Sequence, residues 1–236
     1  MDLTPGYREF GPPDALRDVV ACLWVRVIRT ADQVRVVPDA CTDVVWRQGE
    51  GTTVAGPDTT AKLVCLAPGD VLVGMRFLPG AGGGVLGVPL DSLRDLRIDV
   101  ADIDRAFDVD GDMEPAEVVE RFTSAALGRQ ADPLVAVAAR KVGRQDVGAV
   151  ARDLGVSERQ LRRRFHAAAG YGPKTLARVL RFCRFVDAID GGRADLAALA
   201  FDAGYADQAH LTRETTRLAG LLPAAFMRAR VARVPL

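Results

Sequence analysis

Short runs of apolar and β-branched residues, separated by glycine and proline, fill the chain from about residue 7 to residue 100. The runs that predict strands lie at residues 19–28, 34–37, 43–46, 62–66 and 71–78. The segments between them are rich in Gly, Pro and Asp, which favour turns. Strands of this length at this spacing are typical of a β-sandwich or a small barrel. We therefore predict a β-rich N-terminal domain.

After residue 100 the apolar positions follow the helical period of 3.6 residues. Apolar residues at 118, 119, 122, 126 and 127 predict a helix over 115–127, which the segment 128–133 ends. Further helices are predicted at 133–142, at 147–154 with Asp146 as its N-cap, and after Ser157, which forms a capping box with Gln160. A long helix is predicted over 174–189, and it ends at two glycines. Its apolar residues near one stripe are Leu176, Val179, Leu180, Cys183, Val186 and Ile189.

These patterns predict an α+β chain with two domains. We place the boundary after residue 128, which gives a β-rich domain with terminal helices at 1–128 and an all-α domain at 129–236.

The all-α domain contains one pattern twice. Ala151 and Gly155 recur 49 residues later as Ala200 and Gly204, and three further positions recur 50 residues later. These three pairs are Leu161 and Leu211, Gly170 and Gly220, and Pro173 and Pro223. A small residue on the first helix and a glycine at the corner let two helices cross closely, as in a helix-turn-helix. The sequence thus predicts two helix-turn-helix units joined by the long helix.

The second helix of each unit carries the candidate DNA-reading side chains. Arg159, Arg162 and Arg163 share the predicted solvent face of the first such helix, and Gln208, His210, Thr212 and Arg213 occupy the matching region of the second. Arginine pairs bidentately with guanine and glutamine with adenine in the major groove. We call the two helix-turn-helix units the first and the second head. The long helix is expected to hold them about 34 Å apart, which is one helical turn of DNA.

The charged residues are distributed unequally between the two predicted domains, 1–128 and 129–236. Residues 1–128 hold 12 Lys and Arg against 21 Asp and Glu, and residues 129–236 hold 19 against 10. The overall net charge of zero therefore combines an acidic half of −9 with a basic half of +9. A regulatory domain fused to a nucleic-acid reader has this asymmetry, because only the reader neutralises phosphates.

Residues from about 130 to 230 resemble the double helix-turn-helix domain of the AraC/XylS family of bacterial transcription regulators. The segment 204–214, GYADQAHLTRE, carries the resemblance most strongly, followed by Gly220, Pro223 and Phe226. The family pattern has an aromatic residue where this chain has Thr215 and usually a threonine where it has Leu222, both expected packing positions. The resemblance implies double-stranded DNA as the partner, with RNA polymerase and a second copy of the chain as further candidates.

The N-terminal half resembles a sensor module fused to AraC-type domains. The matching segments are 36–43, 74–81 and 86–89. Trp24, Arg35, Trp46 and Arg76 lie near predicted strand ends and are our candidates for binding a small effector. The alternative is that the aromatic residues only fill the core.

The competing function classes are an enzyme, a DNA-repair protein with the same DNA-binding module, and a pure interaction module. Residues 1–128 contain no histidine, which excludes a His-ligated cupin metal site, so no metal or cofactor is expected. The glycine-rich segment 80–84 lacks the Lys of a phosphate-binding loop and predicts a flexible turn. A nucleophilic Cys41 needs a lowered pKa, which its neighbours Asp39 and Asp43 oppose. The basic recognition helices argue against the interaction module.

Cysteine usage and hydropathy set the expected compartment. The four cysteines form no C-x-x-C pair, the first residues do not resemble a secretory signal, and no apolar segment is long enough to span a membrane. We therefore expect a cytoplasmic protein with no membrane partner. Because none of the catalytic or cofactor sites considered above fits the sequence, we also expect no enzymatic activity.

Overall fold

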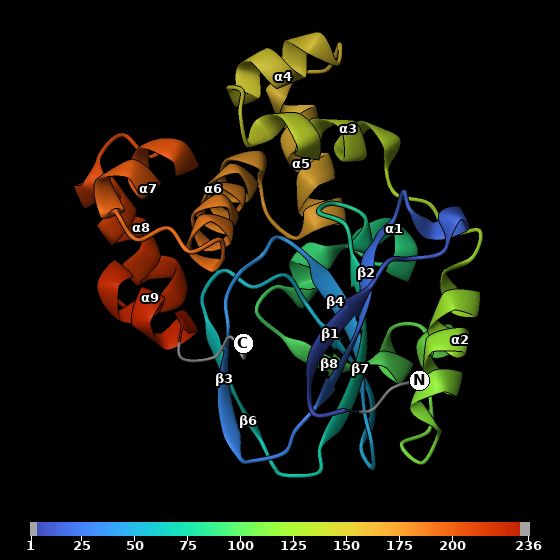
Figure 1. Ribbon diagram of the computed structural model, residues 1–236. Coiled ribbons are helices and arrows are strands. Elements are labelled where there is room, and N and C mark those ends of the chain that lie inside the picture. Colours follow the sequence, from blue (N-terminus) through green and yellow to red (C-terminus); the bar gives the residue numbers. More distant parts are fainter. Residues whose placement is uncertain (1–3, 232–236) are drawn as a thin grey trace.

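The computed structural model describes residues 4–231 and has the predicted order, with a β-rich half first and a helical half after it (Figure 1). The strands are β1 (Gly6–Phe10), β2 (Val20–Val27), β3 (Asp32–Val36), β4 (Thr42–Arg47), β5 (Gly51–Ala55), β6 (Lys62–Leu66), β7 (Val71–Phe77) and β8 (Arg97–Asp99). The helices are α1 (Gly82–Leu86), α2 (Pro115–Ala126), α3 (Pro133–Val142), α4 (Val147–Asp153), α5 (Glu158–Ala169), α6 (Pro173–Asp190), α7 (Leu196–Ala203), α8 (Gln208–Ala219) and α9 (Pro223–Val231).

The N-terminal strands form one large sheet and one separate ribbon. The antiparallel sheet has the order β1-β2-β7-β4-β5-β8, and β3 pairs with β6 as a two-stranded ribbon. Figure 1 shows α2 on one side of the sheet and the β3–β6 ribbon on the other. All five predicted strands are present. The pattern of apolar runs did not predict β1, β5 and β8. The strand β1 is largely polar, β5 begins with glycine and two threonines, and β8 has only three residues.

The two faces of the sheet are buried in different ways. On the α2 side, Val44, Val73 and Met75 are fully buried, and the ring of Phe107 contacts those of Phe77 and Phe122 edge to face. On the ribbon side, a smaller cluster joins Trp24 and Leu72 of the sheet to Leu66 of β6. Strand side chains alternate between faces, so the central strands β2, β4 and β7 each contribute to both clusters.

The helical half is organised around α6, which contacts α3, α5, α7, α8 and α9. The predicted stripe is correct at Leu176, Val179, Val186 and Ile189, which are buried. Leu180 and Cys183 of the stripe are half-buried and pack against the same core. Phe182 and Phe185, which the stripe omitted, are fully buried against Phe226. A helix surrounded by five others buries more than one stripe, and a single amphipathic period does not predict this.

The glycine-rich segment differs from its prediction. Instead of a flexible turn, residues 82–86 form the short helix α1, which packs against α5. A Cβ on Gly83 would lie 2.4 Å from the carbonyl oxygen of Ala167, and one on Gly84 would lie 2.3 Å from that of Gln130. Glycine is therefore required here because two backbones meet without room for a methyl group. The two halves of the chain are packed against each other at this point.

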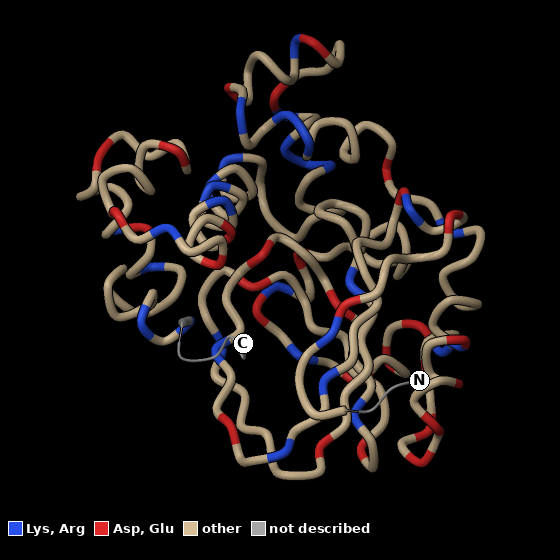
Figure 2. Tube along the Cα trace, viewed as in Figure 1, with Lys and Arg blue, Asp and Glu red and all other residues tan. Residues whose placement is uncertain are grey.

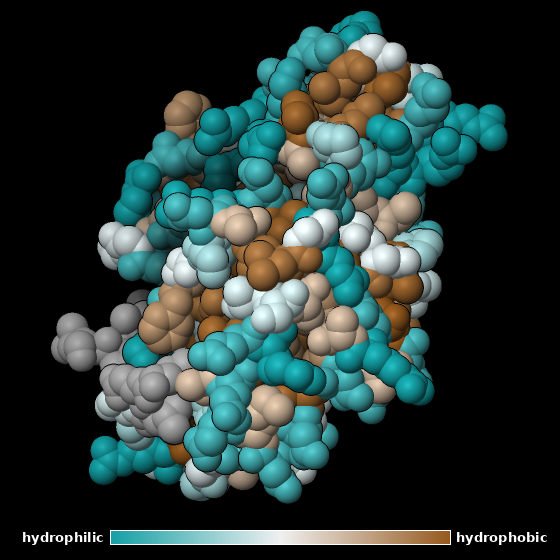
Figure 3. All heavy atoms as spheres, turned by 90° about the vertical axis from the view of Figure 1, so that its right-hand side faces the viewer, coloured by the Kyte–Doolittle hydropathy of each residue, from teal (hydrophilic) through white to brown (hydrophobic). Residues whose placement is uncertain are grey.

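No helix within residues 4–231 has the length and apolar character needed to cross a membrane. In agreement, the face in Figure 3 has hydrophilic side chains between separate apolar patches.

Candidate nucleic-acid interface

The first helix-turn-helix unit consists of α4 and α5. Asp146 caps α4 through the amide of Gly148 at 2.9 Å, and Gly155 turns the chain with a φ of 65°. Ser157 and Gln160 form the predicted capping box, in which the amide of each residue donates to the other's side chain, at 3.2 and 3.0 Å. These contacts span at most three residues, which is why the sequence predicts them reliably.

The second unit repeats this arrangement with α7 and α8. Asp195 caps α7 through the amide of Ala197 at 3.0 Å, Gly204 turns the chain with a φ of 85°, and Asp207 caps α8 through the amide of His210 at 2.6 Å. Leu161 and Leu211 are both fully buried, as expected for equivalent core positions. Thr215 is also fully buried, so it is a packing position, whereas Leu222 is 61% exposed and is not one.

The predicted reading residues of α5 are available to a partner. Arg159, Arg162 and Arg163 are exposed, and within residues 4–231 none of them has a hydrogen-bond or ion-pair partner. Arg162 also lies beside the start of α6, since its Cγ is within 3.7 Å of where a Cβ of Gly172 would be. The helix thus presents three unpaired guanidinium groups to solvent.

The predicted residues of α8 divide into two pairs. Gln208 and Arg213 are exposed. His210 and Thr212 are half-buried and have local partners. The Nδ1 of His210 accepts from the Ala206 amide at 3.4 Å, and the Thr212 hydroxyl donates to the Gln208 carbonyl at 2.9 Å. The second head therefore offers fewer free donors than the first.

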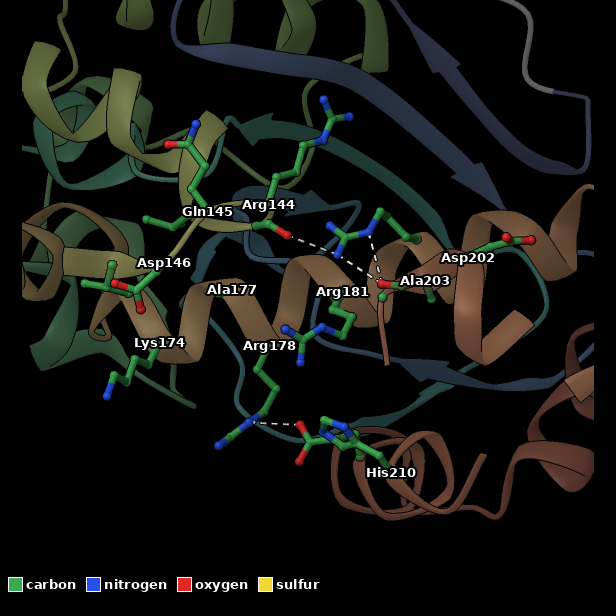
Figure 4. Close-up of a pocket in the computed structure, with 16 residues that line it drawn as sticks. Arg144, Gln145, Asp146, Lys174, Ala177, Arg178, Arg181, Asp202, Ala203 and His210 are labelled. Carbon is green, nitrogen blue, oxygen red and sulfur yellow. Dashed lines mark hydrogen bonds and ion pairs between the residues drawn. The ribbon is translucent and has the colours of Figure 1, made fainter. Parts of the chain in front are cut away.

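A basic groove lies between the two units and was not predicted. It encloses about 840 Å³ and is lined by Lys174, Arg178 and Arg181 of α6, with residues of α3, α4, α7 and α8 around them (Figure 4). The helical spacing of these three residues was the signal available in the sequence. Figure 2 shows basic positions gathered along α6 and near α4 and α5, and acidic ones around α2.

Electrostatics in the groove are dominated by like charges. Arg178 is held by an ion pair with Glu214, with Nε and Oε2 2.9 Å apart. Burial lowers the pKa of Arg184 below its usual value, and the nearby Arg181 and Arg144 lower it further. A groove with this excess of cations is suited to an anionic partner.

A second cavity, of about 510 Å³, lies between the large sheet and the β3–β6 ribbon. It brings together three of the four predicted effector residues, Trp24, Arg35 and Arg76. Trp46 does not line it, because this side chain is on the α2 face of the sheet, where its Nε1 donates to the Asp110 carbonyl at 2.8 Å. Trp46 is therefore a core residue.

Carboxylates surround Arg76 in this cavity. Arg76 forms ion pairs with Asp43 at 3.1 Å, Asp39 at 3.3 Å and Glu9 at 3.4 Å, and Asp43 also accepts from Trp24 Nε1 at 3.1 Å. Burial raises the pKa of Asp43 to about 6, although Arg76 acts in the opposite direction. Asp43 is therefore expected to lose its proton at a higher pH than an ordinary aspartate does.

The residues described here give no support to metal binding or to cysteine chemistry. Within residues 4–231, no group of three His, Cys, Asp or Glu side chains is arranged to hold a metal ion. Burial raises the pKa of the Cys41 thiol well above its usual value, and Asp39 and Asp43 raise it further. A thiol in this environment is a poor nucleophile.

Comparisons with known proteins identify both halves of the chain. A helix-turn-helix domain family matches residues 150–229, and a domain family of unknown function, DUF6597, matches residues 8–99. No curated protein sequence gives a significant match.

Three solved structures of ToxT from Vibrio cholerae are similar to this chain. The protein of strain O395 is 9% identical, with 86% of this chain and 95% of that one covered and a TM-score of 0.48. A 1.65 Å structure is 7% identical, with 94% and 98% covered and a TM-score of 0.47. An unsaturated fatty acid bound form from strain SCE256 is 11% identical, with 86% and 93% covered and a TM-score of 0.43.

The repeated, capped helix pairs and the family match agree on the C-terminal half. The chain therefore carries an AraC-type helix-turn-helix domain, the DNA-binding domain of transcription regulators, behind an N-terminal DUF6597 domain.

Proposed function

We propose that this protein is a sequence-specific transcription regulator that places α5 and α8 in successive major grooves of DNA. The observation that supports this most is the pair of equivalent, N-capped helices, the first of which presents three unpaired arginines to solvent. In this arrangement Arg159, Arg162 and Arg163 contact bases or phosphates on one half-site. Gln208 and Arg213 contact the other, and His210 and Thr212 exchange their local partners for DNA.

The groove between the units would contact the backbone that joins the two half-sites. Lys174 has no hydrogen-bond or ion-pair partner within residues 4–231 and lies at the start of α6. A cation there can neutralise a phosphate without reading a base. We therefore assign Lys174 and Arg181 to phosphate contacts and the arginines of α5 to specificity.

The test is selection of duplexes from a randomised library by the full-length protein, followed by affinity measurement at increasing salt concentration. The expected outcome is a site with two half-sites about one helical turn apart. The logarithm of the binding constant should fall linearly with the logarithm of the salt concentration, with a slope of roughly −0.9 per phosphate contact. Sedimentation of the complexes gives the number of chains per duplex. An affinity that does not depend on salt, or selection of no common sequence, contradicts the proposal.

We further propose that a small molecule binds in the cavity beside Trp24 and controls DNA binding. The cavity is large enough for a metabolite and combines aromatic, apolar and charged lining residues. One of the similar structures is of ToxT with an unsaturated fatty acid bound. A panel of monocarboxylates, amines and neutral aromatic compounds tests the class of ligand.

A true ligand stabilises the protein by about 2.7 kcal/mol at a hundredfold excess over its Kd. It should also change Trp24 emission and shift DNA affinity by the same factor by which DNA shifts its own affinity. An Arg76→Met variant should lose the response, while Trp46→Phe should keep it. A panel that changes neither the melting temperature nor the emission contradicts this second proposal but not the first.

A further inference from the structure

Both candidate recognition helices end at the same position of the repeat, and an arginine contacts each end. The helices α5 and α8 end at Gly170 and Gly220, which have φ values of 77° and 70°. Arg94 Nε donates to the carbonyl of Gly170 at 2.8 Å. Arg35 Nη1 donates to the carbonyl of Ala219 at 2.9 Å. Both arginines belong to the N-terminal half.

These contacts suit the chemistry of a helix end. The last carbonyls of a helix have no partner within the helix, and together they carry a partial negative charge. A guanidinium group satisfies such a carbonyl and favours that charge at the same time. Two arginines from separate segments thus contact adjacent positions of the repeat, one on each DNA-reading unit, since Gly170 is equivalent to Gly220, the residue after Ala219.

The joint at α5 is tightly packed. A Cβ on Gly170 would lie 2.3 Å from Pro57 Cγ and 3.0 Å from the Leu90 carbonyl. The backbone of α1 at Gly83 approaches the same end of α5 from another direction. Because backbone atoms meet on two sides, this end of α5 cannot move without separating the two halves of the chain.

The joint at α8 is made differently. Besides the Arg35 hydrogen bond, the Ala61 amide donates to the Leu218 carbonyl at 2.8 Å. A Cβ on Gly220 would meet only Arg35 Nη1, at 3.5 Å. Arg35 and Ala61 belong to or adjoin the β3–β6 ribbon, whose strands, within residues 4–231, pair only with each other. The same Arg35 lines the 510 Å³ cavity.

We propose that the N-terminal domain sets the separation of the two recognition helices, with a fixed joint at Gly170 of α5 and a releasable joint at Ala219 of α8. Arg35 is then a positioning residue for the second head, and the ribbon connects it to the cavity. A molecule that displaces the ribbon moves α8 relative to α5. The inference rests on the proposed DNA-binding function, because the separation matters only if both helices contact one duplex.

The experiment compares full-length wild type with Arg35→Met, Arg94→Met and the surface control Arg17→Met. The probes are duplexes selected by the wild type, with the spacer between half-sites changed by one to three base pairs. Each added base pair rotates one half-site by about 34° relative to the other, so a rigid reader loses affinity steeply. We call the dependence of affinity on spacer length the spacing profile. Arg35→Met is expected to make this profile flatter than that of the wild type. Arg35→Lys, which keeps a cationic donor, should restore the wild-type profile.

Arg94→Met should keep the wild-type profile, because the glycine and proline packing at α5 remains. Amide hydrogen exchange provides a readout that needs no DNA. Exchange at Ala61 and around residues 216–222 should be about tenfold faster in Arg35→Met, with no change around residues 166–172.

A spacing profile and exchange pattern of Arg35→Met equal to wild type overturn the inference. A flattened profile in Arg94→Met but not in Arg35→Met overturns the assignment of the releasable joint. If the wild type selects no DNA at all, the proposed function fails, and the exchange measurement alone decides whether the joint at α8 depends on Arg35.

Discussion

Arg184 Nη2 lies 3.0 Å from the carbonyl oxygen of Ala203, the last residue of α7. The same nitrogen donates to the carbonyl of Gly143, which follows α3, at 3.1 Å. One guanidinium group of α6 therefore joins α7 of the second helix-turn-helix unit to the turn that leads into α4 of the first. This contact fixes the orientation of the two units on the helix that connects them.

Replacing Arg184 by Met should lower the free energy of unfolding by about 2–3 kcal/mol, because buried carbonyls lose a charged donor. Thermal and denaturant unfolding measure this loss. Arg193→Met is the matched control, since Arg193 forms only a surface ion pair with Asp202 of the same α7 and should cost less than about 1 kcal/mol. Equal losses in the two variants would show that Arg184 does not join the units.

The buried Asp43 should make the N-terminal domain sensitive to pH. Its pKa is raised from 3.8 to about 6, so the folded protein holds this proton more tightly than the unfolded chain does. The contribution of Asp43 to stability is therefore greatest at low pH and decreases as the pH rises from about 4 to 6.

Tryptophan emission should follow this titration, since Trp24 donates to Asp43. We expect a transition near pH 6 in the wild type and none in Asp43→Asn. Asp58→Asn is the control, because burial also raises the pKa of Asp58 but this carboxylate pairs with Arg97. A transition that survives in Asp43→Asn would assign it to another group.

A methyl group on Gly83 should separate the two halves of the chain. Its Cβ would lie 2.9 Å from Ala168 Cα as well as close to the Ala167 carbonyl, so the backbone of α1 or α5 must shift. We expect Gly83→Ala to lower the unfolding free energy by about 1–3 kcal/mol. Gly11→Ala, which meets nothing within 4 Å, should be nearly neutral in the same melting experiment. A neutral Gly83→Ala would mean that the α1–α5 contact is not tight in solution.

The two heads should contribute unequally to DNA binding. Arg163→Ala should cost about 1–3 kcal/mol of binding free energy and relax the preference at one base position. Arg213→Ala should cost less, because the neighbouring His210 and Thr212 already have local partners. Competition binding with single-base variants of a selected site measures both effects. The reverse ranking would show that α8 is the dominant reader.

Lys174 should act on affinity without changing specificity. Lys174→Met is expected to weaken binding to all sequences alike and to reduce the magnitude of the salt slope by about 0.9. Lys62→Met, in β6 of the N-terminal half, should leave the slope unchanged. A change in base preference in Lys174→Met would contradict a phosphate-only contact.

Local chemistry made most of the DNA-binding half predictable. The caps at Asp146, Ser157 and Asp195 and the glycine corners at Gly155 and Gly204 involve residues at most three positions apart, so the sequence alone specifies them. The strand pattern likewise predicted five of the strands. The exposure of the α5 arginines follows from the buried positions of Leu161 and Phe165 on the opposite face.

Only the tertiary structure decided which long-range partners these elements meet. Trp24 and Trp46 both lie in apolar strand segments of the sequence, but strand register places them on opposite faces of the sheet. Gly74 of β7 pairs with Trp24 on one side and with Val45 on the other, so Trp46 faces away from the cavity. Likewise, the carbonyl partners of Arg35 and Arg94 are 184 and 76 residues away. Side-chain periodicity gives the face of a residue within its own strand or helix, whereas packing determines which neighbour covers that face.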